Sequence, residues 1–177
     1  YFKKIIKNNI TSKKMLHIAP SNVLNNKFLI KYFEVTTCDL EMEDVDLNVN
    51  IEDMNVFEDN SFDFIICSHV LEHVKNPDLA LKEIFRILKK GGKSILMVPI
   101  ILTLKNTIED PSHTTKEERI KHYGQEDHLR SFSKSDFIYR IKNAGFRLEM
   151  LDIKKFTKKK FHELGLKDTS VLYIGNK

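Results

Sequence analysis

Short apolar runs alternate with amphipathic segments along most of the chain, and this alternation restricts the possible folds more than any other feature. Residues 62–67 (FDFIIC) and 93–98 (KSILMV) are nearly continuous apolar runs, as expected of strands buried on both faces. Between these runs, apolar residues recur at helical spacing: Ala80, Leu81, Ile84, Phe85 and Leu88. The order predicts an α/β fold with a doubly wound, mostly parallel sheet and helices on both of its faces.

The whole pattern predicts about seven strands. They are expected over residues 15–19, 33–37, 47–51, 62–67, 93–98, 146–153 and 170–174. Only the segment 158–164 is helix-sized between the last two, so an antiparallel strand is expected at the sheet edge.

Local signals place the helices. One is expected to open at Pro20, and a short one over 114–123 to close at Gly124. Another has Asn76 as its N-cap and Gly91 as its left-handed C-cap. Ser133 and Asp136 resemble a capping box ahead of a further helix that Gly145 ends. Residues 100–131, where the periodicity lapses, are expected to form an insert or lid on the substrate side.

The length of 177 residues fits a single domain over 1–177, with residues 1–14 as a lead-in. No apolar run approaches the roughly 20 residues that span a bilayer, so no membrane association is expected. Cys38 and Cys67 lie in apolar stretches, which indicates reduced core thiols in a cytoplasmic protein.

The net charge is +4, and much of the excess of basic residues lies at the two ends of the chain. No basic groove interleaved with aromatic residues is evident. A nucleic-acid partner is therefore not predicted.

Ligands of doubly wound sheets bind at the carboxyl ends of the strands, near the switch in strand order. The candidate residues after the first four strands are His17, Ala19, Pro20, Asp39, Leu40, Asn50, Ile51, Glu52, Ser68 and His69. Asp39 is suited to accept both hydroxyls of a ribose, although a solvated or capping aspartate is the alternative. Ile51 or Met54 could form an adenine wall, and Asn50, Glu52 or Asp53 could accept from its exocyclic amine.

The segment 58–99 combines a loop, SFD, an apolar strand, HVLEHV, a helix ending in RILKKGG and another strand. This arrangement resembles the core of the class I S-adenosylmethionine-dependent methyltransferases of type 11. HIAP at 17–20, EDPS at 109–112 and GQEDHLR at 124–130 resemble a bacterial subgroup in which HIAP replaces the glycine-rich loop. The resemblance implies S-adenosylmethionine as cofactor, S-adenosylhomocysteine as product and in-line methyl transfer. It also implies that Asp39 binds the ribose, the 50–53 turn the adenine, and Ser68 and His69 the methionine part.

The first loop departs from the family pattern. Most relatives use Gly-x-Gly there, because the backbone approaches the cofactor at positive φ. Ala19–Pro20 is not expected to adopt that conformation, and Pro20 lacks an N–H. Either His17 stands where an acid is usual and the cofactor tail is held differently, or binding is lost. The alternative function is thus an inactive binding or regulatory module of the same fold.

Three interpretations of the insert remain open. His128 or Asp127 could act as a general base from a lid, with His69 as a further catalytic candidate. Asp110, His113 and His128 could hold a divalent metal, but no tight ligand spacing supports this, so no metal site is predicted. The residues could also be structural, with Asp127 paired to Arg130 and with His73 structural.

The predicted activity is methyl transfer to an oxygen or nitrogen of a small-molecule or sugar-like acceptor. A nicotinamide-dependent oxidoreductase is disfavoured because no G-x-G-x-x-G follows the first strand.

Overall fold

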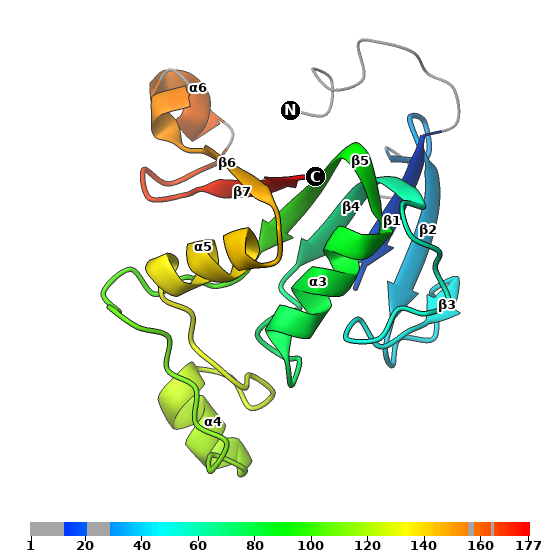
Figure 1. Ribbon diagram of the computed structural model, residues 1–177. Helices are drawn as coiled ribbons and strands as arrows, with labels where there is room; N and C mark the ends of the chain where they lie inside the picture. Colours follow the sequence, from blue (N-terminus) through cyan, green and yellow to red (C-terminus); the bar gives the residue numbers. More distant parts are fainter. Residues whose placement is uncertain (1–12, 21–28, 156–157, 164) are drawn as a thin grey trace.

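A seven-stranded sheet forms the centre of the molecule in the computed structural model, which describes residues 13–20, 29–155, 158–163 and 165–177 (Figure 1). The strands are β1 (Lys14–Ile18), β2 (Glu34–Asp39), β3 (Leu47–Asn48), β4 (Phe62–Ser68), β5 (Leu88–Met97), β6 (Arg147–Leu151) and β7 (Leu172–Asn176). The described helices are α3 (Pro77–Ile87), α4 (Lys116–Tyr123), α5 (Lys134–Asn143) and α6 (Lys158–Glu163), with a 3-10 helix over Ile153–Lys155.

The strand order is β3-β2-β1-β4-β5-β7-β6. The first five strands pair in parallel, whereas β7 is antiparallel to both of its neighbours. The predicted doubly wound, mostly parallel α/β sheet is therefore confirmed. The last two strands pair antiparallel and β6 forms the edge, as expected; β7, between β5 and β6, is the strand that runs opposite to the others.

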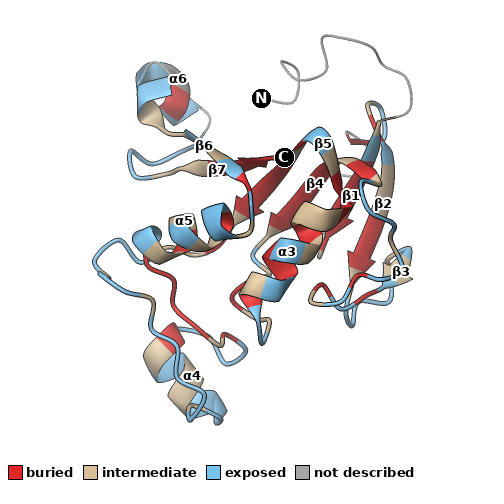
Figure 2. Cartoon of the chain, viewed as in Figure 1, coloured by how far each residue is buried: buried red, intermediate tan, exposed pale blue. Residues whose placement is uncertain are grey.

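Each face of the sheet carries its own apolar core. On one face, α3 and α5 lie side by side over the strands, and both turn their buried residues toward the sheet (Figure 2). On the other face, Met15, Phe64 and Ile95 pack with Leu29 and Phe33. Side chains alternate between the faces along each strand, so one continuous run of apolar residues serves both cores.

The helix predicted from residue 76 begins as expected and ends earlier. The Asn76 side chain accepts hydrogen bonds from the N–H groups of Asp78 and Leu79, each at 3.1 Å. The helix ends at Ile87 because Leu88 is extended, fully buried and paired with Phe62 of β4. The predicted capping role of Gly91 is wrong. With φ of 78°, Gly91 lies inside β5, where the pairing register with β4 shifts.

Other boundaries differ locally. The third strand covers only Leu47–Asn48, because Asn50 starts a turn in which its carbonyl accepts from Asp53 N–H at 3.0 Å. Ser133 accepts from Asp136 N–H, but the reciprocal half of the capping box is absent, since the Asp136 carboxylate bonds to Thr107 and Arg140 instead. The lead-in up to residue 12 and residues 21–28 of the helix expected after Pro20 lie outside the described residues.

The insert is anchored at its base by two bridges, Ile100 to Phe132 and Ile108 to Ser131. Its helix α4 has a full capping box between Thr115 and Glu118, and Gly124 closes it at φ of 87° as predicted. In Figure 1, α4 projects from the sheet beside the carboxyl ends of the strands.

None of the described helices combines the length and apolar composition needed to cross a bilayer. Cys38 and Cys67 are free and buried, as expected of core thiols. Burial, together with the neighbouring Asp39 carboxylate, raises the pKa of the Cys38 thiol to about 12. Both thiols are therefore protonated at neutral pH and act as small apolar side chains.

Candidate cofactor crevice

A crevice of about 670 Å³ opens at the carboxyl ends of β1 and β2 and beside the loop 69–75 that follows β4. Its lining residues are Ile18, Ala19, Asp39, Leu40, Glu41, Val49, Asn50, Ile51, Glu52, His69, Val70, His73, Val74, Lys75 and Asp127. The strand order reverses between β1 and β4, so the crevice lies at the switch point where open α/β sheets bind their ligands.

Most of the predicted site residues meet in this crevice. It brings together Ala19, Asp39, Leu40, Asn50, Ile51, Glu52, His69 and Asp127. His17, Pro20, Ser68 and His128 are not part of its lining. His17 is buried in β1 on the same sheet face as Met15, because side chains alternate along the strand, and this turns it away from the opening.

The glycine-free loop adopts the backbone conformation expected only of glycine. Ala19 has φ of 48°, and its N–H donates to the Cys38 carbonyl at 2.8 Å. The expectation that Ala19 cannot take positive φ is thus wrong, although Pro20 still lacks a donor. His69, across the crevice, has φ of 58° and donates its N–H to the Met97 carbonyl at 2.8 Å. A left-handed non-glycine residue costs roughly 1–2 kcal/mol, and such strain is concentrated at functional sites.

The Asp39 carboxylate caps the loop after β2 and leaves one oxygen free to accept from a ligand. Its Oδ1 accepts from the N–H groups of Glu41 at 2.8 Å and Met42 at 2.9 Å, which fixes the loop after β2. This bonding holds the carboxyl group at the crevice wall and leaves Oδ2 to accept from a ligand.

The turn after β3 is held by its own polar side chains. Asn50 Oδ1 accepts from Glu52 N–H at 3.0 Å, and Glu52 Oε1 accepts from Asn76 N–H at 2.7 Å. These bonds tie the turn to the start of α3. Ile51 lines the crevice, whereas Met54 is fully buried and does not, so Ile51 is the apolar wall of the two candidates.

The loop 69–75 is fixed by a buried arginine that the sequence analysis considered only as a partner of Asp127. The Arg130 guanidinium, 2% exposed, donates to the carbonyls of Leu71 at 2.8 Å, Val74 at 2.6 Å and Lys75 at 3.1 Å. It also pairs with Glu109 Oε1 at 2.7 Å. Arg130 therefore attaches the insert to the loop that walls the crevice.

The predicted pair of Asp127 with Arg130 is wrong. Asp127 Oδ2 lies 3.2 Å from His73 Nδ1 instead. His73 lines the crevice and lies against a carboxylate of the insert. His128 is 6% exposed, and its Nδ1 lies 3.3 Å from the Tyr123 carbonyl oxygen. From this position it does not face the crevice as the predicted general base would.

The three residues considered from the sequence as metal ligands, Asp110, His113 and His128, do not come together in the structure. His113 Nδ1 lies 2.9 Å from the Tyr123 hydroxyl, which also accepts from Asp110 N–H at 2.9 Å. The His113 ring stacks on His122 with centroids 4.0 Å apart. The His128 ring instead packs edge-on against His73, with centroids 4.8 Å apart.

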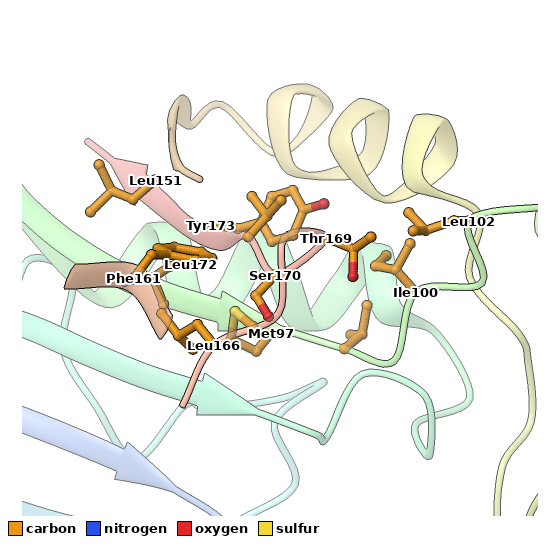
Figure 3. A pocket seen from close by; sticks show the side chains of 12 residues that line it. Met97, Ile100, Leu102, Leu151, Phe161, Leu166, Thr169, Ser170, Leu172 and Tyr173 are labelled. Atoms are coloured by element: carbon orange, nitrogen blue, oxygen red, sulfur yellow. The ribbon is translucent and has the colours of Figure 1, made fainter. Parts of the chain in front are cut away.

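A second pocket, of about 480 Å³, begins where β5 ends (Figure 3). It is lined by Met97, Val98, Ile100, Leu102, Leu151, Phe161, Leu166, Thr169, Ser170, Val171, Leu172 and Tyr173. The labelled side chains from β5, α6, β7 and the start of the insert point toward a common space in Figure 3. Met97 lines this pocket and its carbonyl accepts from His69 of the crevice, so the two cavities lie on either side of the β4 and β5 ends.

Comparison with known proteins places this site in a family. Residues 9–96, about half of the chain, match the family model described as Methyltransferase domain. An uncharacterized protein of Methanocaldococcus jannaschii is 30% identical over 91 residues, which cover 51% of this chain and 41% of that protein. The ubiquinone/menaquinone biosynthesis C-methyltransferase UbiE of Hydrogenovibrio crunogenus is 38% identical over 53 residues, covering 30% of this chain and 21% of that enzyme. The matches thus span less than half of the length of these curated relatives.

Solved structures share the fold over nearly the whole chain. A putative methyltransferase of Bacillus halodurans has a TM-score of 0.60 at 19% identity, covering 98% of this chain and 92% of that one. Phosphoethanolamine N-methyltransferase 2 of Haemonchus contortus, in complex with S-adenosyl-L-methionine, has a TM-score of 0.63 at 17% identity, covering 99% of this chain and 51% of that one. At such identities the likeness shows the fold alone. The match over residues 9–96 identifies the chain as a member of this methyltransferase-domain family, and its fold agrees with that of these solved structures.

Proposed function

We propose that the chain transfers the methyl group of S-adenosylmethionine to an oxygen or nitrogen of a small-molecule acceptor in the cytoplasm. The observation that carries this proposal is the presence of two cavities that are linked by the bond from His69 N–H, in the crevice, to the carbonyl of Met97, in the second pocket. One has a carboxylate suited to a ribose, and the other is apolar and of the size of a small ligand.

Within the crevice, we assign the ribose hydroxyls to Asp39 and the adenine to Ile51 and the polar groups of the 50–53 turn. Ala19 supplies the positive φ that lets the backbone approach the methionine part, as glycine does elsewhere. This conformation answers one of the two objections that favoured an inactive module, and the missing N–H of Pro20 is the other. His69 and Asp127, whose side chains are 62% and 61% exposed, are the polar groups that we expect to face the acceptor.

The second pocket supports a small acceptor with an apolar body. Its lining consists chiefly of aliphatic and aromatic side chains, with Thr169 and Ser170 as polar exceptions. An apolar wall with few polar groups is typical of a small-molecule site. Methyl transfer from a sulfonium is served by positioning and exclusion of water, because the thioether leaving group is already activated.

Placing a charge in this pocket tests the assignment. We expect Leu102→Arg to lower methyl transfer to small acceptors by about tenfold or more, since a longer charged side chain at this exposed part of the wall takes space and apolar contact from the acceptor. S-adenosylmethionine affinity should stay unchanged, because Leu102 does not line the crevice. The measurement is mass-spectrometric detection of methylated products from a panel of small alcohols and amines.

Leu79→Arg is the matched control, because Leu79 is an exposed leucine of α3 outside both pockets. Equal losses in the two variants, or transfer to RNA with no transfer to any small compound, would contradict the proposed acceptor class.

A further inference from the structure

Three side chains from two distant segments meet behind the crevice wall. Glu72 and His73 belong to the loop after β4, and His128 belongs to the insert. One ligand atom from each lies within 4.8 Å of the others, and these three form the one such group of histidine, cysteine or acidic residues in the described part of the chain. We propose that Glu72, His73 and His128 form a binding site for a divalent transition-metal ion.

The Glu72 carboxylate lacks compensation in the protein itself. It is 1% exposed, and neither oxygen has a hydrogen-bond partner. The nearest cationic candidates are His69 Nδ1 at 3.3 Å and His73 Nε2 at 3.9 Å, neither with hydrogen-bond geometry. A buried carboxylate without donors is costly unless a positive charge offsets it, and a bound cation would supply that charge.

Both histidines have their second nitrogen engaged in the way that metal ligands do. His73 Nδ1 faces the Asp127 carboxylate at 3.2 Å, and His128 Nδ1 faces the Tyr123 carbonyl at 3.3 Å. Metal-binding histidines usually donate this N–H to a carboxylate or a backbone carbonyl, which fixes the tautomer. In that tautomer, Nε2 of each ring carries the lone pair that binds a metal.

The ligand chemistry selects the class of ion. Two imidazoles and one carboxylate suit Zn²⁺ and its first-row neighbours, whereas Mg²⁺ and Ca²⁺ prefer oxygen ligands alone. In a tetrahedral site with ligands at about 2.1 Å from the ion, neighbouring ligand atoms are about 3.4 Å apart, so separations of up to 4.8 Å would close by about 1.4 Å or less on binding. Such a shift lies within the reach of ordinary side-chain rotations.

The site would be open on one side. Three protein ligands leave a coordination position free in catalytic metal sites. His73 and Asp127 also line the crevice, so the site borders the cofactor space. The metal site stands on these side chains alone. None of the three residues lines the second pocket, so the metal site does not depend on the proposed acceptor.

Titration of metal-free protein with Co²⁺, followed by its visible absorption and by Zn²⁺ competition, tests the site. We expect one equivalent to bind with absorption typical of nitrogen and oxygen ligands. His128→Gln and Glu72→Gln should each weaken Co²⁺ binding by about a hundredfold, and Asp127→Asn, which removes the partner of His73, by about tenfold. His122→Gln is the control, since it removes a histidine of the other ring pair in the same insert.

Loss of affinity in the His122→Gln variant, unchanged affinity in Glu72→Gln, or no binding by folded wild-type protein would overturn the site. Thermal unfolding shows whether each variant is folded, so that a loss of Co²⁺ binding can be told apart from a loss of structure. Without metal, Glu72→Gln should be at least as stable as wild type, because a buried charge is removed, while added Zn²⁺ should raise only the wild-type melting temperature. Titration of the same metal-free samples with S-adenosylmethionine separates failure of the metal site from failure of the proposed function.

Discussion

Replacing Arg130 by methionine should lower the free energy of unfolding by about 3–5 kcal/mol. The methionine keeps much of the side-chain volume but leaves the carbonyls of Leu71, Val74 and Lys75 without their donor. Each buried acceptor deprived of its partner costs about 1–3 kcal/mol. Urea unfolding followed by circular dichroism measures the change.

Arg119→Met is the matched control in the same insert. The Arg119 side chain donates from Nε to the His113 carbonyl at 3.3 Å and is partly exposed. Its replacement should cost less than about 1 kcal/mol. Equal effects of the two substitutions would contradict the role of Arg130 as the anchor between the insert and the loop 69–75.

Asp39→Asn should weaken S-adenosylmethionine binding by about ten- to a hundredfold while leaving the free energy of unfolding nearly unchanged. Asparagine retains an oxygen that accepts from Glu41 and Met42, so the loop after β2 stays capped. It replaces the second carboxylate oxygen by an amide, which removes a charge-assisted bond to the ribose worth about 1.5–3 kcal/mol. Isothermal titration calorimetry measures the affinity.

Asp44→Asn removes an exposed carboxylate of the same acidic stretch and controls for the change in net charge. It should leave the affinity as in wild type. An Asp39→Asn variant that binds as tightly as wild type would show that Asp39 only caps its loop.

Much of the fold could be predicted from the sequence because its signals are local. The apolar run of β4 and the Asn76 cap of α3 each act within a few residues. The end of α3 could not be predicted in this way, because pairing of Leu88 with Phe62 draws the chain into β5 before Gly91 is reached. Tertiary pairing overrides the local cap signal there.

The candidate site, too, could be predicted from the sequence only where its residues follow directly from strand ends. Asp39 and the 50–53 turn follow strand ends, so their convergence follows from the topology of the sheet. The conformation of Ala19 could not be read from its residue type, because the bond of its N–H to the Cys38 carbonyl holds it at positive φ. The grouping of Glu72 with His128 depends on how the insert folds back, and Arg130 sets this through contacts more than fifty residues away in sequence.

Calorimetric titration of the folded wild-type protein with S-adenosylmethionine, and competition by S-adenosylhomocysteine, tests the cofactor crevice most directly. We predict a single site of about micromolar affinity, equivalent to about −8 kcal/mol, from which the product displaces the cofactor. No heat with either ligand, and no protection of the protein against thermal unfolding by either, would contradict the crevice as the cofactor site.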